Sequence, residues 1–307
     1  MVDMEEAQPI SHSQRSLLAV VMLVILLACV AAAWWLSQTR NAGPSIIDEM
    51  RRTGLRKLWG PDGRTDFYVL ADAGGQPLGW WAVSRWPTDD GYAGETFVRT
   101  ESRAQIDSPV ETWKLSDDAR QGQYTGASIV GRTVLSTSIA LADGEVVVAH
   151  KYKGVKVDAQ DRAPANYIPE GSLDLVVRLV QQQGREARFA MLFDTRALAA
   201  EDGRAAVTFT PVRMVPQQGG AVRMEFQTEE GSQVSVFHID AEGRVDKVEE
   251  FVAAKGRTAA LSSVRKLVSP DEIEAMFPND DLLTNLVEKA KSQNRSTTSQ
   301  AVAWAGR

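Results

Sequence analysis

The chain has 307 residues, of which 44% are apolar and 24% charged, and its formal net charge is -6 at pH 7. This composition excludes a disordered chain and provides for one large hydrophobic core or two smaller ones. Acidic and basic residues are interspersed, so there is no basic stripe to neutralise phosphates, and nucleic acid is excluded as an expected partner. The only cysteine, Cys29, lies near the N-terminus. We therefore expect no disulfide framework, cysteine metal site or cysteine nucleophile beyond it, which fits an oxidising compartment.

After a short N-terminal tail (1–15), the chain contains an uncharged apolar run from Ser16 to Leu36. About 21 helical residues at about 1.5 Å each span the roughly 30 Å of hydrocarbon in a bilayer. Trp34 and Trp35 end the run, where amphipathic rings favour the headgroup region. The pattern predicts a single transmembrane helix and makes the membrane the first expected partner.

Two other interpretations of this run remain open. Small residues at 31–33 are typical of a signal-peptide cleavage site, although the preceding region is long and acidic for that role. The run ending at Cys29 resembles a bacterial lipoprotein box, although apolar rather than polar residues follow it.

The two orientation signals disagree. Only Arg15 precedes the predicted helix, whereas five basic residues follow it, and this count places the large domain in the cytoplasm. The short tail, the thiol-free domain and the frequent export of β-rich domains behind one N-terminal anchor favour the opposite side. We expect a single-pass protein of the inner (cytoplasmic) membrane with an extracytoplasmic domain.

Residues 41–60 are typical of a juxtamembrane helix of about four turns. Ser45 can cap its start, acidic residues occupy the first turn, and Gly54 weakens it. From about residue 61 to 278 the sequence pattern is typical of a β-rich domain. Short segments rich in Val, Ile, Phe, Tyr, Trp and Thr are separated by turns that contain Gly and Asp. The clearest strand is Ala221 to Gln227, where apolar and polar residues alternate. Further strands are expected near 66–72, 77–86, 92–103, 122–130, 132–141, 145–153, 187–195, 206–214, 232–240, 245–253 and 258–267.

One segment interrupts the strands and is predicted to be a central helix packed on the sheet. Its apolar stripe is formed by Leu173, Val176, Val177 and Val180, and Gly184 ends it. After the strands, Ser269 and Pro270 open a short helix to Phe277. Residues 279–307 are expected to be a C-terminal helix over about 280–290 and then a loose polar tail.

The predicted fold class is mainly β: a transmembrane helix followed by one large, curved antiparallel sheet, half-barrel-like, packed on the central helix. Two local patterns sharpen this expectation, FYVLADAGGQPLGWWAV and the hairpin VFHIDAEGRVDKVE. Over roughly residues 66–268 the chain resembles the incomplete β-barrel of periplasmic lipoprotein carriers and related envelope domains of unknown function. The resemblance implies lipid binding by analogy only, and no ligand residue can be matched.

The sequence gives few signs of catalysis. His12 precedes the predicted membrane helix, and His150 and His238 are interpreted as ordinary strand residues. There is no Gly-x-Ser-x-Gly motif, no zinc-binding His motif and no phosphate-binding loop. The run from Asp240 to Asp246 superficially resembles a calcium loop but lacks the ligand pattern, and it is interpreted as a solvated hairpin. We expect no catalytic residue, no cofactor and no metal.

The tryptophans are the most suggestive feature. Trp80 and Trp86 share one face of a predicted strand and Trp81 lies on the other, so one set can be core while the other lines a groove. Together with Trp113 they are the candidate ligand or interface residues. Three functions follow: a structural or protein-interaction module of the cell envelope, a carrier or binding domain for a lipid or other apolar ligand, and an enzyme of unrecognised type. The first is the leading expectation.

Overall fold

The computed structural model describes residues 45–100, 109–130, 133–152, 155–192, 207–228, 231–254 and 259–305. The predicted membrane segment, Ser16 to Leu36, and the tail before it lie outside these residues, so the anchor and its orientation stay predictions. Within the described ranges no helix is both long enough and apolar enough to cross a membrane.

The described chain is mainly β and forms one antiparallel sheet of 14 strands. The strands are β1 (Arg64–Asp72), β2 (Pro77–Pro87), β3 (Gly91–Thr100), β4 (Glu111–Ser116), β5 (Gly122–Val130), β6 (Thr133–Ala142), β7 (Glu145–Tyr152), β8 (Val155–Arg162), β9 (Ala187–Met191), β10 (Thr210–Pro216), β11 (Val222–Thr228), β12 (Gly231–Ile239), β13 (Val245–Ala254) and β14 (Ala260–Val268). Eleven of these lie near strand ranges predicted from the sequence, and the expected alternation over Ala221 to Gln227 corresponds to β11. The short strand β4 and the edge strand β8 were not predicted.

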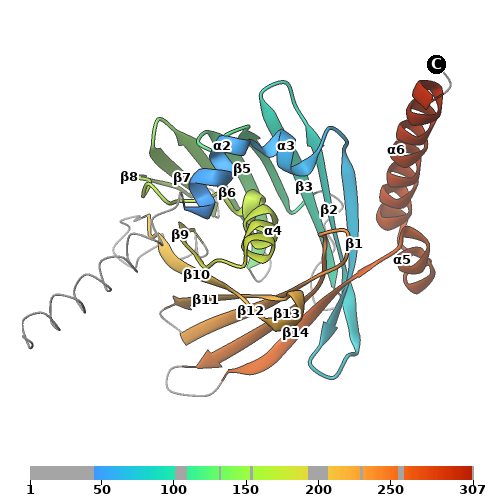
Figure 1. Ribbon diagram of the computed structural model, residues 1–307. Helices are drawn as coiled ribbons and strands as arrows, with labels where there is room; N and C mark the ends of the chain where they lie inside the picture. Colours follow the sequence, from blue (N-terminus) through green and yellow to red (C-terminus); the bar gives the residue numbers. More distant parts are fainter. Residues whose placement is uncertain are drawn as a thin grey trace, which may run out of the picture. The chain divides into compact units, whose positions relative to one another are not determined.

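The sheet consists of two meanders joined by its first and last strands. Its order is β8-β7-β6-β5-β4-β3-β2-β1-β14-β13-β12-β11-β10-β9. At the join, Tyr68 of β1 lies opposite Leu267 of β14. The right-handed twist of neighbouring strands accumulates over so many strands, and the sheet curls into an incomplete barrel (Figure 1). The edge strands β8 and β9 do not pair with each other, so the sheet stays open.

The segment between β8 and the central helix partly fills the opening. Tyr167 forms an isolated parallel bridge with Ala190 of β9, and the Ile168 amide donates to the Ala190 carbonyl at 3.0 Å. The Tyr167 ring meets Phe209 edge-on, with centroids 5.3 Å apart. These contacts give the β9 edge part of the partner that a closed barrel would supply.

The central helix α4 (Leu173–Gln183) lies inside the curl (Figure 1). Val176, Val177 and Val180 of the predicted stripe are fully buried, and Leu175 and Leu179 are buried as well. α4 is therefore covered on more than one side. It begins after the short helix η1 (Glu170–Ser172) and ends at Gly184, whose φ of 60° permits the left-handed stop.

The helix expected over 41–60 is two helices, α2 (Ile46–Thr53) and α3 (Leu55–Trp59). Gly54 separates them with a φ of 87°, a conformation that L side chains rarely adopt. Four of their residues are buried in the same core as α4: Ile46, Ile47, Met50 and Leu55. This helix pair therefore belongs to the β-rich unit and covers its concave side.

Two C-terminal helices pack on the convex side of the sheet, α5 (Pro270–Met276) and α6 (Asp281–Ala305). α5 begins near the position that the sequence predicts, and the structure adds a capping box between Ser269 and Glu272. Leu283 and Val287 of α6 pack with Trp80 in a second core. The expected loose tail is wrong up to Ala305, because α6 continues through that polar stretch, which contains no Gly or Pro to stop it. A short helix η3 (Gln218–Gly220) precedes β11.

Candidate functional site

The helices do not fill the concave side of the sheet completely. A cavity of about 470 Å³, here called the chamber, remains beside α4. Strands of both meanders line it, together with α3, α4 and η1. Its aromatic and apolar lining includes Trp59, Tyr68, Trp81, Val83, Trp113, Tyr124, Met224, Phe226, Phe237, Val245 and Val248. Its charged lining is Arg64, Asp66, Arg85, Glu111, Glu170, Asp174, Arg178, Glu242, Arg244, Glu250 and Arg265.

The structure divides the candidate tryptophans between the two faces of the sheet. Trp81 and Trp113 line the chamber. Trp80 is buried in the convex core, where its indole N–H donates to Asp280 at 2.9 Å. Trp86 lies beneath Lys289 of α6, whose ammonium is 5.9 Å from the ring centroid. The expected alternation along β2 is observed, and only one set of tryptophans reaches the cavity.

Trp113 occupies its place because two neighbouring residues are glycines. A Cβ at Gly94, opposite Trp113 in the β3–β4 pair, would lie 2.3 Å from the indole ring. A Cβ at Gly171 in η1 would lie 2.7 Å from it. Both distances are far below van der Waals contact, so the bare backbone of β3 and η1 forms the walls against which this ring packs.

A chain of ion pairs ties the sheet to α4 along one wall of the chamber. Arg85 of β2 donates to Asp66 at 2.7 Å and to Asp174 of α4, while Arg64 pairs with the other oxygen of Asp66 at 2.6 Å. The Trp59 indole donates to the same Asp174 oxygen at 3.2 Å. Burial disfavours the charged form of Arg85, but Asp174 and Asp66 outweigh it and raise the pKa of the guanidinium.

Arg265 of β14 is held from two directions. Its guanidinium lies 4.7 Å above the centroid of the Trp81 ring and donates to Glu250 at 3.1 Å. Glu250 also accepts from Ser263 at 2.8 Å. These contacts hold Arg265 in place at the chamber wall and neutralise Glu250.

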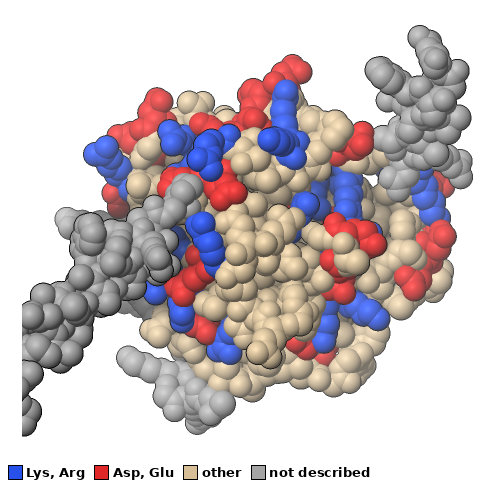
Figure 2. Space-filling view, viewed as in Figure 1, with Lys and Arg blue, Asp and Glu red and all other residues tan. Residues whose placement is uncertain are grey.

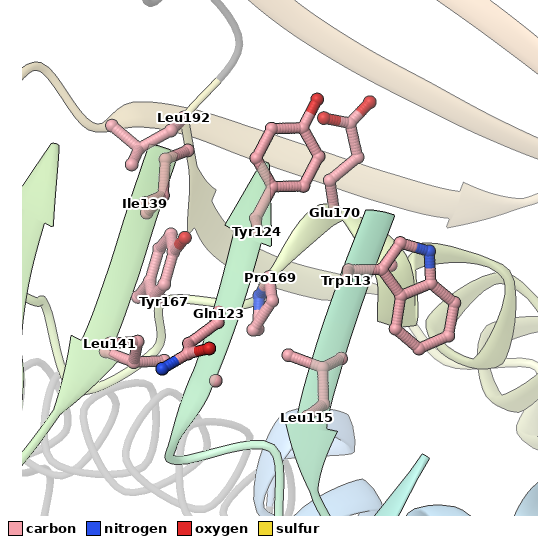
Figure 3. A pocket seen from close by; sticks show the side chains of 12 residues that line it. Trp113, Leu115, Gln123, Tyr124, Ile139, Leu141, Tyr167, Pro169, Glu170 and Leu192 are labelled. Atoms are coloured by element: carbon pink, nitrogen blue, oxygen red, sulfur yellow. The ribbon is translucent and has the colours of Figure 1, made fainter. Parts of the chain in front are cut away.

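Two carboxyl groups, Glu111 of β4 and Glu170 of η1, line the chamber, and Figure 3 shows the second of them. Glu170 of η1 extends beside Tyr124 of β5, and Glu111 of β4 forms a side-chain hydrogen bond with Tyr124. Glu170 is solvent-accessible and borders the open chamber, which it lines. Burial, followed by the negative charge of Glu111, raises the pKa of Glu170 to about 8, and Arg265 opposes the shift. Burial and these carboxylates also raise the pKa of Tyr124.

A smaller cavity of about 30 Å³ adjoins the chamber and shares Trp113, Tyr124, Glu170 and Gly171 with it. Its remaining lining is mostly apolar, including Leu141, Tyr167 and Leu192. Glu170 therefore lies between the chamber and this smaller, mostly apolar cavity.

His150 and His238, the two histidines among the described residues, are not part of the chamber lining. His150 is a buried residue of β7 whose Nδ1 lies 2.9 Å from Thr137 Oγ1. His238 of β12 has Nε2 2.9 Å from Glu249. Asp240 caps its own turn by accepting from the amides of Glu242 and Arg244. Among the described residues no group of three or more possible metal ligands occurs.

The predicted site contained two of the chamber's aromatic residues but none of its charged ones. Glu170 lies just before the predicted central helix and was not among the candidate site residues. Glu111 shares a strand face with Trp113 and Leu115, so the alternation of β4 could have placed it beside Trp113. Arg85 and Asp174 are far apart in sequence, and no local pattern connects them.

Charges outside the chamber show no comparable organisation on the face in Figure 2. There, basic and acidic side chains are intermingled around an uncharged central region. The ion pairs and the two carboxyl groups of the chamber are therefore its distinctive electrostatic feature.

No protein-family model and no curated protein matches the sequence. One solved structure with some similarity is described as a porin-like protein from Bacteroides uniformis. The two chains share 9% sequence identity, with a TM-score of 0.21, and the match covers 70% of this chain and 98% of the other. A score this low carries no argument about fold or function. The open, curled sheet fits an incomplete β-barrel architecture, and no family is identified.

Proposed function

We propose that this chain is a membrane-anchored binding protein of the cell envelope whose chamber holds an amphipathic small molecule. The observation that carries the proposal is the 470 Å³ chamber on the concave side of the sheet. Ligand sites are typically concave, largely preformed and lined by aromatic groups with a few polar ones. The predicted anchor at Ser16 to Leu36 would keep the chamber close to a membrane.

For a binding domain, the sequence led us to expect a lipid or other apolar ligand, and the charged residues of the chamber lining favour an amphipathic one. A purely apolar ligand would leave the ion pairs of Arg85 and Arg265 facing hydrocarbon, which is unfavourable for charged groups. An amphipathic ligand can place its apolar part against Trp81, Phe237 and Val248 and its polar part against the charged wall. α4 is packed in the core on the concave side of the sheet, and the chamber remains open beside it.

A neutral fluorescent amphiphile, N-phenyl-1-naphthylamine, tests this function on the full chain in lipid nanodiscs. The substitution Val83→Trp places a large ring in the chamber from β2. We expect the wild-type chain to bind the probe and V83W to lose at least about tenfold in affinity, equivalent to about 1.4 kcal/mol. Val147→Trp is the matched control, because Val147 of β7 is 38% exposed and lies outside the chamber lining. Equal binding by all three chains would contradict the proposal.

A second candidate is the structural or protein-interaction module that the sequence favoured. Edge strand β8 supports it, because its outer edge has no strand partner among the described residues and its Val155 is 64% exposed. Unpaired edges can accept a strand from another chain. Crosslinking from residue 155 to a partner strand in membranes, with unchanged probe binding, would favour this module.

A further inference from the structure

The charge of the chamber's ligand can be inferred from the carboxyl pair, an inference that rests on the proposed function. Glu111 and Glu170 come from different elements, β4 and η1, and both line the chamber. Neither forms an ion pair with a cation among the described residues. The chamber therefore contains two acidic groups without the paired base that Asp66, Asp174 and Glu250 have.

Each element packed against Glu170 contributes a group that acts on it. β4 supplies Glu111, β5 supplies Tyr124, the segment before η1 supplies Tyr167, and β14 supplies Arg265. Arg265 is the one cation in this set, and Glu250 and the Trp81 ring already hold it. From α4, Asp174 is neutralised by Arg85. The balance at this end of the chamber is therefore negative.

The walls here have the composition that recognises an organic cation. The Trp113 ring is fixed against Gly94 and Gly171, and the Tyr124 ring lies beside it across the β4–β5 pair. Aromatic faces attract ammonium groups, most strongly where water is excluded, and a carboxylate adds direct charge complementarity. Burial, followed by the negative charge of Glu111, raises the pKa of Glu170 to about 8, so without a ligand Glu170 retains a proton at neutral pH.

We infer that this end of the chamber binds the positively charged head of an amphipathic ligand, an alkylammonium group, and that the Glu111–Glu170 pair releases a proton when the head enters. The cation replaces the proton as the charge that compensates the second carboxylate, and the proton passes to solvent. No covalent bond forms or breaks. The chamber provides the site, and the carboxyl pair sets its charge preference and its dependence on pH.

The test compares octyltrimethylammonium with octyl sulfate, two probes with the same tail and opposite charge, by titration calorimetry on the full chain in nanodiscs. Subtraction of V83W nanodiscs removes partition into the lipid. We expect tighter binding of the ammonium probe and an affinity that rises by at least about tenfold from pH 6 to pH 8, since one released proton gives up to about tenfold per pH unit. Titration in two buffers of different ionisation enthalpy should count close to one proton released at pH 7.

Glu170→Gln should remove the pH dependence and lower the affinity for octyltrimethylammonium by about tenfold, while Glu145→Gln, on the exposed part of β7, should change neither. Binding of N-phenyl-1-naphthylamine by E170Q shows that the chamber remains folded and open. Tighter binding of octyl sulfate, or pH-independent ammonium binding without proton release, would overturn the inference while the neutral probe still upheld the proposed function. If the wild-type chain did not bind N-phenyl-1-naphthylamine, the proposed function itself would be overturned.

Discussion

Glu170 gives folding a pH dependence whose sign follows from its raised pKa. The ordinary value is 4.5 and the folded value is about 8, so the folded state binds a proton that the unfolded state releases. Its contribution to stability is therefore fully present below pH 4.5 and is lost as the pH rises to about 8. Chemical unfolding from pH 4 to pH 9 should show wild type losing stability relative to Glu170→Gln across this window, with a constant difference above it. A difference that is constant throughout, or that changes in the opposite direction, would show that Glu170 ionises normally.

A substitution at Val177 tests whether α4 is an essential part of the hydrophobic core. Its side chain is fully buried, so Val177→Asp places a carboxylate in an apolar environment without a partner. We expect a loss of about 4 kcal/mol or more in the free energy of unfolding, which is a large part of the roughly 5–15 kcal/mol typical of a domain. Val155→Asp is the control, because its 64% exposure predicts a change within about 0.5 kcal/mol. If V177D melts like wild type, α4 is a lid that can lift away and not part of the core.

The side of the sheet on which a residue lies relative to its neighbours could be predicted from the sequence, whereas its contacts with distant elements could not. The period of two along β2 was enough to separate Trp80 from Trp81, because a strand alternates its faces whatever surrounds it. The same pattern could not show which face holds the cavity. The meeting of Glu111 and Glu170 depends on how η1 is placed against β4, which no local spacing in the sequence specifies.

At the scale of elements, Asp280 helps to attach α6 to the sheet through three polar contacts. Asp280 accepts from the Trp80 indole at 2.9 Å, pairs with Arg99 at 2.8 Å and caps the helix by accepting from the Leu283 amide at 3.1 Å. Asp280→Ala leaves a buried indole N–H and the Arg99 guanidinium without this acceptor, and it removes the cap. We expect a loss of about 3–5 kcal/mol in unfolding free energy, measured by denaturant titration.

Asp271→Ala is the matched control for Asp280. Its carboxylate is 85% exposed and pairs with Lys291, so removing it should cost less than about 1 kcal/mol. Similar losses for the two variants would mean that α6 is held by its apolar contacts alone.

The predicted helices agree best with the structure where the sequence clearly marks the start or end of the helix. α5 was expected from Ser269 and Pro270 at its start, and α4 from its apolar stripe followed by Gly184. β8 was missed because Lys, Asp, Gln and Arg fill its exposed positions, as is common on edge strands that must avoid pairing with other chains. β4 was missed because six residues between two turns give little periodicity.

At the scale of the whole molecule, the curved sheet was expected from the run of hairpin-like strands, whereas its topology was not. Consecutive strands mostly pair with each other, and sequence order predicts that part of each meander. The pairing of β1 with β14, which joins the two meanders and forms the curl, links segments about 200 residues apart. No local pattern encodes such a long-range contact. The sequence therefore indicated that some tryptophans could line a groove, but it could not show where the groove lies.

The placement of the domain outside the cytoplasm is the prediction with the largest consequence for the chamber's ligand. Five basic residues follow the predicted membrane helix, and by count alone they would hold the domain inside. Two of them have structural roles in the folded unit: Arg51 donates to the carbonyls of Ala165 and Tyr167 at 2.6 and 2.7 Å, and Arg56 donates to the carbonyl of Thr88. Charges selected for such contacts are weaker evidence about topology than charges in a free loop. We therefore expect alkaline phosphatase fused after Arg307 to be active and a fluorescent protein that matures only in the cytoplasm to stay dark at the same position. The reverse pattern would place the domain in the cytoplasm and direct the search for the proposed cationic ligand to that compartment.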